Sequence, residues 1–151
     1  MNRRIKILYV DDEPNNLQSF IANFRQEFDI LTASSGKHGL EILQCKEVQI
    51  IMSDQRMPDM TGVEFLAETL KLCNEPIRIL MTDNSNASTI IDAINKAQIY
   101  YYLPKPWNEK HLRATIMAGN EIYDVRARNK ELIGLVSEAN EQMRKILYCL
   151  P

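Results

Sequence analysis

The feature that most constrains this fold is the regular alternation of short apolar runs with amphipathic segments. Four runs of five or six residues are almost continuously apolar and rich in β-branched or aromatic side chains. They cover residues 5–10, 48–52, 77–81 and 99–103, and a weaker fifth run covers 30–33. Runs of this length and composition are typical of strands that are covered on both faces, as in a parallel sheet.

Helical patterns separate these runs. After Pro14, which suits a first helical turn, apolar residues follow at spacings of three and four through Phe24. Similar patterns begin at Gly39 and Gly62, after a cap at Asn86 or Ser88, and after a cap at Asn108. Strand and helix therefore alternate five times. This alternation predicts an α/β fold with a doubly wound, five-stranded parallel sheet and right-handed crossovers.

Composition excludes several classes of protein. A chain of 151 residues suits one domain with an appendage, and its net charge of −2 argues against broad electrostatic binding of nucleic acid or anionic membrane. Three dispersed cysteines (Cys45, Cys73 and Cys149) predict neither a disulfide framework nor a zinc site. No apolar stretch has the length of a signal-peptide core or a membrane span. We therefore expect a cytoplasmic location.

Polar residues follow the strongest runs at the point where each predicted strand ends. They are Asp11, Asp12 and Glu13 after the first, Asp54 after the second, Thr82 and Asp83 after the third, and Lys105 after the last. In open α/β sheets, ligands bind beyond these carboxyl ends. Each residue alone is more typical of a turn or a cap, but their combination indicates a site.

Carboxylates gathered at one rim repel one another unless a cation binds. Oxygen ligands suit a hard ion, which predicts Mg²⁺, with Mn²⁺ as a substitute. A carboxylate nucleophile, a divalent cation, a lysine and a hydroxyl together make a site for a transferred phosphoryl group.

The motifs at these positions resemble the receiver domain of two-component response regulators, over residues 4–121. They are LYVDDEP at 8–14, DQRMPDMTG at 54–62, LMT at 80–82 and YLPKPW at 102–107. The resemblance implies a flavodoxin-like sheet of order 2-1-3-4-5, in which the weak run is an edge strand.

The resemblance also implies site residues. Asp54 is expected to accept a phosphoryl group from a histidine kinase or a histidine phosphotransfer protein. Asp12, Asp54 and the backbone carbonyl of Arg56 are expected to bind Mg²⁺ directly, and Asp11 through water.

A switch is implied as well. Thr82 is expected to donate a hydrogen bond to the phosphoryl oxygen, and Lys105 to pair with the phosphoryl group. Tyr102 would turn inward when Thr82 moves, or would simply pack in its strand, as we expect of Tyr100 and Tyr101. The helix after Thr82, the last strand and the final helix should then change.

One residue departs from the family pattern. Position 83 is usually small, and here it is Asp83, whose carboxylate should disfavour an incoming phosphodonor unless it points to solvent. Asn84, like Arg56, is expected at the mouth of the site, where it would tune the lifetime of the phosphate.

After about residue 120 the pattern becomes a heptad seam, continuous with the last receiver helix. The seam consists of Ile122, Val125, Asn129, Leu132, Val136, Ala139, Met143, Ile146 and Leu150. Asn129 at an a position favours a parallel two-stranded coiled coil. We therefore divide the chain into a receiver at 1–121 and a signalling linker at 122–151, which forms an extended C-terminal helix and a homodimer. There are three alternatives for this helix: it folds back on its own receiver, it forms a different oligomer, or it binds in a groove of a partner protein.

Five acidic and five basic residues after position 120 cancel, so no DNA-binding stripe is predicted. The expected function is that of a response regulator which is not itself an enzyme. The alternative is the receiver and linker of a longer regulator, with a cyclic-dinucleotide phosphodiesterase or cyclase as its output. A hydrolase is disfavoured, because position 56 is Arg where such enzymes carry a second Asp.

Overall fold

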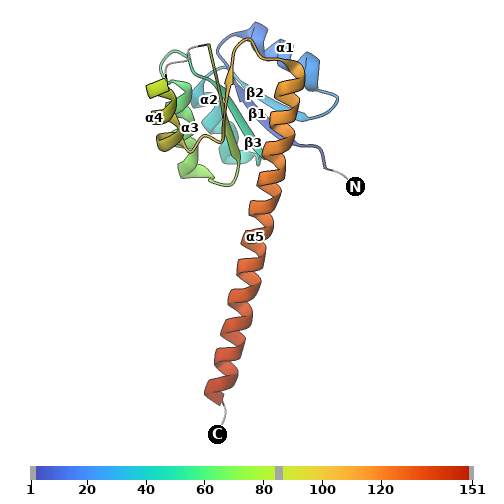
Figure 1. Ribbon diagram of the computed structural model, residues 1–151, viewed down its shortest axis with the longest axis vertical. Helices are drawn as coiled ribbons and strands as arrows, with labels where there is room; N and C mark the ends of the chain where they lie inside the picture. Colours follow the sequence, from blue (N-terminus) through green and yellow to red (C-terminus); the bar gives the residue numbers. More distant parts are fainter. Residues whose placement is uncertain (1–2, 84–86, 150–151) are drawn as a thin grey trace.

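The computed structural model describes residues 3–83 and 87–149. Strands and helices alternate along the chain: β1 Lys6–Val10, α1 Pro14–Phe24, β2 Asp29–Ala33, α2 Gly36–Cys45, β3 Ile50–Asp54, α3 Gly62–Leu72, β4 Ile77–Thr82, α4 Ala87–Ala97, β5 Tyr101–Pro104 and α5 Glu109–Cys149. The α/β fold with an extended C-terminal helix is confirmed (Figure 1).

The five strands form one parallel sheet in the order β2-β1-β3-β4-β5. This is the flavodoxin-like order that we expected, and the weak run forms the edge strand β2. The four strands with polar ends are therefore neighbours, and their carboxyl ends meet along one rim.

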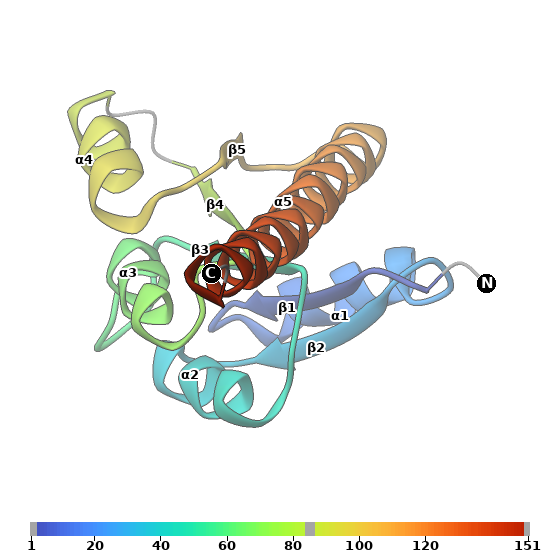
Figure 2. The ribbon, with the colours of Figure 1, turned by 90° about the horizontal axis from the view of Figure 1, so that it is seen from below.

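Helices cover both faces of the sheet (Figure 2). An apolar layer lies between the sheet and the helices on each face. Phe20 and Phe24 of α1 pack with Leu112 and Ile116 of α5 on one face. Side chains of α2, α3 and α4, including Phe65, fill the other face. Alternate strand residues point into opposite layers, which explains why the runs are continuously apolar.

Several local boundaries differ from the sequence prediction. Helix α2 begins at Gly36 rather than Gly39, because the Ser35 hydroxyl accepts a hydrogen bond from the His38 backbone at 3.1 Å. Ser88 lies inside α4 and does not cap it; Asn86 is outside the described residues. Strand β5 begins at Tyr101, two residues later than the run suggested.

Tyr100 and Tyr101 are more exposed than we expected. Their exposed fractions are 39% and 37%. Tyr101 begins the edge strand β5 and Tyr100 directly precedes it, so both residues lie at the margin of the sheet.

A buried arginine lies inside the third apolar run. Arg78 of β4 is only 2% exposed, and its guanidinium donates to the Thr69 hydroxyl and the Pro76 carbonyl at 2.8 Å each, and also to the Cys73 carbonyl. Arg78 thus closes the C-terminal end of α3 by satisfying carbonyls there.

Helix α5 continues well beyond the sheet (Figure 1). Ile122 and Tyr123 still pack partly against the core, and Lys130 Nζ lies 2.9 Å from Glu75 Oε1. From 124 to 149 every residue of the helix is exposed, so the tail does not fold back on the receiver layers. Among the described helices, none is long and apolar enough to cross a membrane.

Candidate functional site

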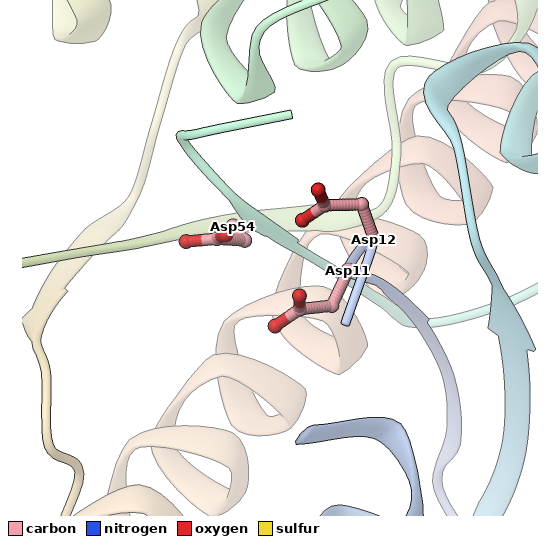
Figure 3. A group of neighbouring side chains, drawn as sticks. All are labelled: Asp11, Asp12 and Asp54. Atoms are coloured by element: carbon pink, nitrogen blue, oxygen red, sulfur yellow. The ribbon is translucent and has the colours of Figure 1, made fainter. Parts of the chain in front are cut away.

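Three aspartates converge at the rim. Asp11 and Asp12 follow β1, Asp54 ends β3, and each offers an oxygen that lies within 4.8 Å of the others (Figure 3). Asp11 is fully buried, Asp54 is 7% exposed, and Asp12 is more accessible. An all-oxygen donor set of this charge fits a hard divalent cation such as Mg²⁺.

Lys105 supplies the opposing charge within the site. Its Nζ atom lies 3.0 Å from Asp54 Oδ1 and 3.3 Å from Asp11 Oδ2. The Lys105 backbone N–H donates to the Thr82 carbonyl at 2.9 Å, which extends the β4–β5 pairing by one step. Strand pairing thus holds the lysine opposite the aspartates, although 94 residues separate it from Asp11 in the sequence.

Burial and neighbouring charges shift the pKa values of Asp54 and Lys105. Burial raises the pKa of Asp54, and the nearby Asp11 adds to this effect, although Lys105 opposes it. Burial alone would lower the pKa of Lys105, but its hydrogen bond to Asp54 and the charges of both carboxylates raise it. The lysine therefore stays charged, and the carboxylate cluster is incompletely neutralised.

Asp11 has further hydrogen-bond donors that sequence reasoning missed. Its Oδ2 atom accepts from the Tyr9 hydroxyl at 2.6 Å and from Asn16 Nδ2 at 3.1 Å, and its Oδ1 atom from the Glu13 backbone at 3.0 Å. Tyr9 could have been found from strand periodicity, because residues two apart in a strand point to the same face.

Thr82 and Tyr102 lie on the adjoining strands. Thr82 ends β4 with 4% exposure and lines a cleft together with Asp12 and Arg56. Tyr102 pairs in register with Leu80 and is partly buried against the layer that contains α2, α3 and α4.

Two charged residues lie across the mouth of the site. Arg56 Nε is 3.8 Å from Asp83 Oδ1, and both line a cleft with Asp54 and Lys105. Asn84 is outside the described residues.

The loop after Asp54 is held to the start of α3. Gln55 Oε1 accepts from the Val63 backbone at 2.9 Å, and the Thr61 hydroxyl accepts from Glu64 at 3.2 Å. A Cβ atom on Gly62 would lie 2.2 Å from the Asp54 carbonyl oxygen. Only glycine permits this approach, so Gly62 helps to fix the strand end that carries Asp54.

Comparison with known proteins identifies the family. The response regulator receiver domain matches residues 7–117. The chain belongs to the response regulator receiver domain family. Among curated relatives, the hydrogenase transcriptional regulatory protein HoxA of Cupriavidus necator is 36% identical over 115 residues, covering 76% of this chain and 24% of that protein. The receiver chain spans about a quarter of the length of the first curated relatives it matches.

Solved structures agree with this family. The crystal structure of adenylate cyclase from Rhodopirellula baltica superposes on this chain with a TM-score of 0.83 and 28% identity, covering 87% of this chain and 98% of that one. The signal receiver domain of an HD domain-containing protein from Pseudomonas fluorescens superposes with a TM-score of 0.78 and 29% identity. That comparison covers 82% of this chain and 99% of the other chain.

Proposed function

We propose that Asp54 accepts a phosphoryl group from a histidine kinase or a histidine phosphotransfer protein. The observation that carries this proposal is the position of Asp54: a nearly buried carboxylate, 3.0 Å from Lys105 and beside two further aspartates. This arrangement presents a nucleophile where charge on a transferred phosphoryl group is countered.

In the proposed transfer, an Asp54 oxygen forms a bond to phosphorus as the phosphorus–nitrogen bond of the phosphohistidine breaks. The electron pair of that bond returns to the imidazole. Lys105 leaves the carboxylates and pairs with the phosphoryl oxygens. The Thr82 hydroxyl donates a hydrogen bond to one of these oxygens.

A divalent cation completes the proposed site. Asp12, Asp54 and the backbone carbonyl of Arg56 would hold Mg²⁺, or Mn²⁺, with Asp11 acting through water. When bound, the cation supplies positive charge that neutralises the carboxylates and the phosphoryl oxygens. The all-carboxylate donor set supports this assignment.

Phosphorylation would then switch the surface next to β4. Thr82 moves toward the phosphoryl group, and Tyr102 turns into the space vacated. The surfaces of α4, β5 and the start of α5 change as a result, because the added charge and acceptors reorder the loop at the rim. Asp83 and Asn84 would modulate the rate and the lifetime of the phosphate.

We further propose that residues 122–151 form a linker that dimerises in parallel. Its support is the exposed seam of α5, whose large side chains are more than half exposed: Leu132, Val136, Met143 and Ile146. Ile133, Leu135 and Leu147 widen the apolar stripe beyond a strict dimer seam, so a different oligomer is the alternative. Such a surface is typical of a helix that packs on another helix.

The receiver is proposed to promote only its own phosphorylation and dephosphorylation. We propose a cytoplasmic location, because histidine kinases are phosphorylated by ATP there. It would contact proteins and not nucleic acid. The second candidate is a receiver and linker that control an enzymatic output, such as a cyclic-dinucleotide phosphodiesterase or cyclase. The two similar solved structures, an adenylate cyclase and the signal receiver domain of an HD domain-containing protein, favour this candidate.

Phosphoryl labelling tests the central proposal. The wild-type chain, incubated with Mg²⁺ and acetyl phosphate, should take up an acid-stable, base-labile label that Asp54→Asn abolishes. Asp59→Asn is a matched control, because Asp59 is an exposed carboxylate in the same loop. Label retained in Asp54→Asn would refute the assignment.

A further inference from the structure

Tyr9 is a fully buried tyrosine whose hydroxyl reaches the aspartate cluster. Its ring packs against Phe20 with centroids 4.9 Å apart, in the apolar layer between the sheet and helices α1 and α5. Its hydroxyl donates to Asp11 Oδ2 at 2.6 Å, the shortest of the three side-chain bonds to that oxygen. A phenylalanine would fill the same space without making this bond.

The described side-chain donors to Asp11 Oδ2 come from three places in the fold. Tyr9 approaches from β1, Asn16 from α1 and Lys105 from the end of β5. In the proposed reaction, Lys105 leaves to pair with the phosphoryl group. Tyr9 and Asn16 are then the side chains that hold Asp11 Oδ2 while the site is occupied.

We infer that Tyr9 is a positioning residue for the divalent cation. With Asn16, it fixes the rotation of the Asp11 carboxylate, so that the group proposed to hold the cation through water is in place before the cation arrives. A hydrogen-bond partner behind a metal ligand orients that ligand, and its loss commonly costs about tenfold or more in metal affinity. This inference rests on the proposed function, because it assumes that the aspartate cluster binds Mg²⁺.

The position of Asp11 explains why a buried donor is needed. The carboxylate is fully buried and lies at the border of an apolar layer, where water does not reach its inner side. A buried carboxylate without donors on that side would turn toward other partners. Tyr9 supplies the donor from within the apolar layer.

The test is the Mg²⁺ affinity of Tyr9→Phe. Binding is followed by calorimetry and by the fluorescence of Trp107, which is the single tryptophan and lines the cleft with Asp54 and Lys105. We expect the Kd for Mg²⁺ to rise about tenfold. The Mg²⁺ concentration for half-maximal labelling by acetyl phosphate should rise in parallel, while the labelling rate at saturating Mg²⁺ stays within about twofold of wild type.

Tyr123→Phe is the matched control, because Tyr123 is a partly buried tyrosine on α5 far from the rim, against a pocket formed with Cys73 and Lys130. Its Mg²⁺ affinity should equal that of wild type. If Tyr9→Phe does not fold, Asn16→Ala removes the other fixed donor from a partly exposed position and should also weaken Mg²⁺ binding.

An unchanged or tighter Kd for Mg²⁺ in a folded Tyr9→Phe overturns the inference, and so does a lower labelling rate at saturating Mg²⁺ with no change in Kd. The two proposals fail differently. Wild-type protein that binds Mg²⁺ but takes no label at Asp54 refutes the proposed function and leaves the role of Tyr9 standing.

Discussion

Arg56 Nε lies 3.8 Å from Asp83 Oδ1, across the cleft that also contains Asp54 and Lys105. Asp83 therefore does not face the phosphodonor as an isolated negative charge. Both side chains are largely exposed, at 74% and 57%, so the pair is weak and screened by salt.

Asp83→Ala should still accelerate labelling by small anionic phosphodonors. An exposed charge is worth less than about 1 kcal/mol, which corresponds to an increase of roughly two- to fivefold. The measurement is the initial rate with acetyl phosphate at low and high salt, and the acceleration should shrink at high salt. Equal rates for wild type and Asp83→Ala would mean that Asp83 only faces solvent.

Arg56→Gln serves as the background that tests how Asp83 acts. If the Asp83 carboxylate repels the phosphodonor directly, Asp83→Ala should accelerate labelling more in the Arg56→Gln background. In that background the arginine no longer shields the negative charge of Asp83. A double-mutant cycle measures this difference. A smaller acceleration in that background would contradict direct repulsion.

The raised pKa of Asp54 predicts how metal-free stability depends on pH. A carboxyl group with a higher pKa in the folded chain than in the unfolded chain destabilises the fold at neutral pH. This penalty is complete above the folded pKa and disappears as the pH falls below the unfolded value of about 3.9. In EDTA, Asp54→Asn should therefore melt at a higher temperature than wild type at pH 7, and the difference should shrink on acidification.

Excess Mg²⁺ should reverse this order, because the wild type binds the cation more tightly and gains more stability from it. Asp59→Asn should melt like wild type under both conditions, since Asp59 is exposed. Identical melting of wild type and Asp54→Asn in EDTA at pH 7 would contradict the prediction.

The parallel sheet and the polar residues at its rim were predictable for one physical reason, whereas the strand order was implied by the resemblance to receiver domains. Continuous apolar runs mark buried parallel strands, and the residue after each run necessarily lies at the carboxyl rim. Asp11, Asp54 and Lys105 meet there because β1, β3, β4 and β5 are neighbours in the sheet. Spacing alone did not predict that Lys105 contacts two carboxylates at once.

Other features depend on packing that a linear pattern does not contain. Arg78 interrupts an apolar run, and only its burial against the end of α3 shows that carbonyls satisfy it. Strand periodicity places Tyr9 on the same face as Asp11, but the hydrogen bond between their side chains depends on how both are packed. Tyr101 was expected to pack, yet an edge strand leaves it 37% exposed.

Gly62→Ala should destabilise the receiver by about 1–3 kcal/mol, as overpacking typically does. The added Cβ would lie 2.2 Å from the Asp54 carbonyl oxygen, so the backbone has to move beside the proposed phosphoryl acceptor. Labelling of Asp54 should also slow down. Urea unfolding and the initial labelling rate measure the two effects.

Gly134→Ala is the matched control for this substitution. A Cβ atom on Gly134 has nothing within 4 Å, and the residue lies inside α5. Alanine is favoured over glycine in a helix by up to about 1 kcal/mol, so this variant should be slightly stabilised and labelled at the wild-type rate. Equal stability of the two variants would contradict the role of Gly62.

The exposed seam of α5 predicts a dimer whose contacts begin beyond the receiver. Truncation after residue 130 keeps Ile122 and Tyr123 in their partly buried positions and preserves the ion pair between Lys130 and Glu75. The full chain should therefore scatter light as a dimer, whereas residues 1–130 should be monomeric and folded. If the full chain and residues 1–130 are both monomeric, the proposed linker function is wrong.

Substitutions within the full chain refine this test. Leu132→Asp together with Val136→Asp places charge on the seam, at side chains that are 58% exposed in the single chain. Buried charges at such positions oppose helix pairing, so the double variant should be monomeric with an unchanged receiver. Ser137→Asp adds a charge about 100° further around the same helix, and it should leave the dimer intact. A dimer that survives the double substitution would place the interface outside this seam.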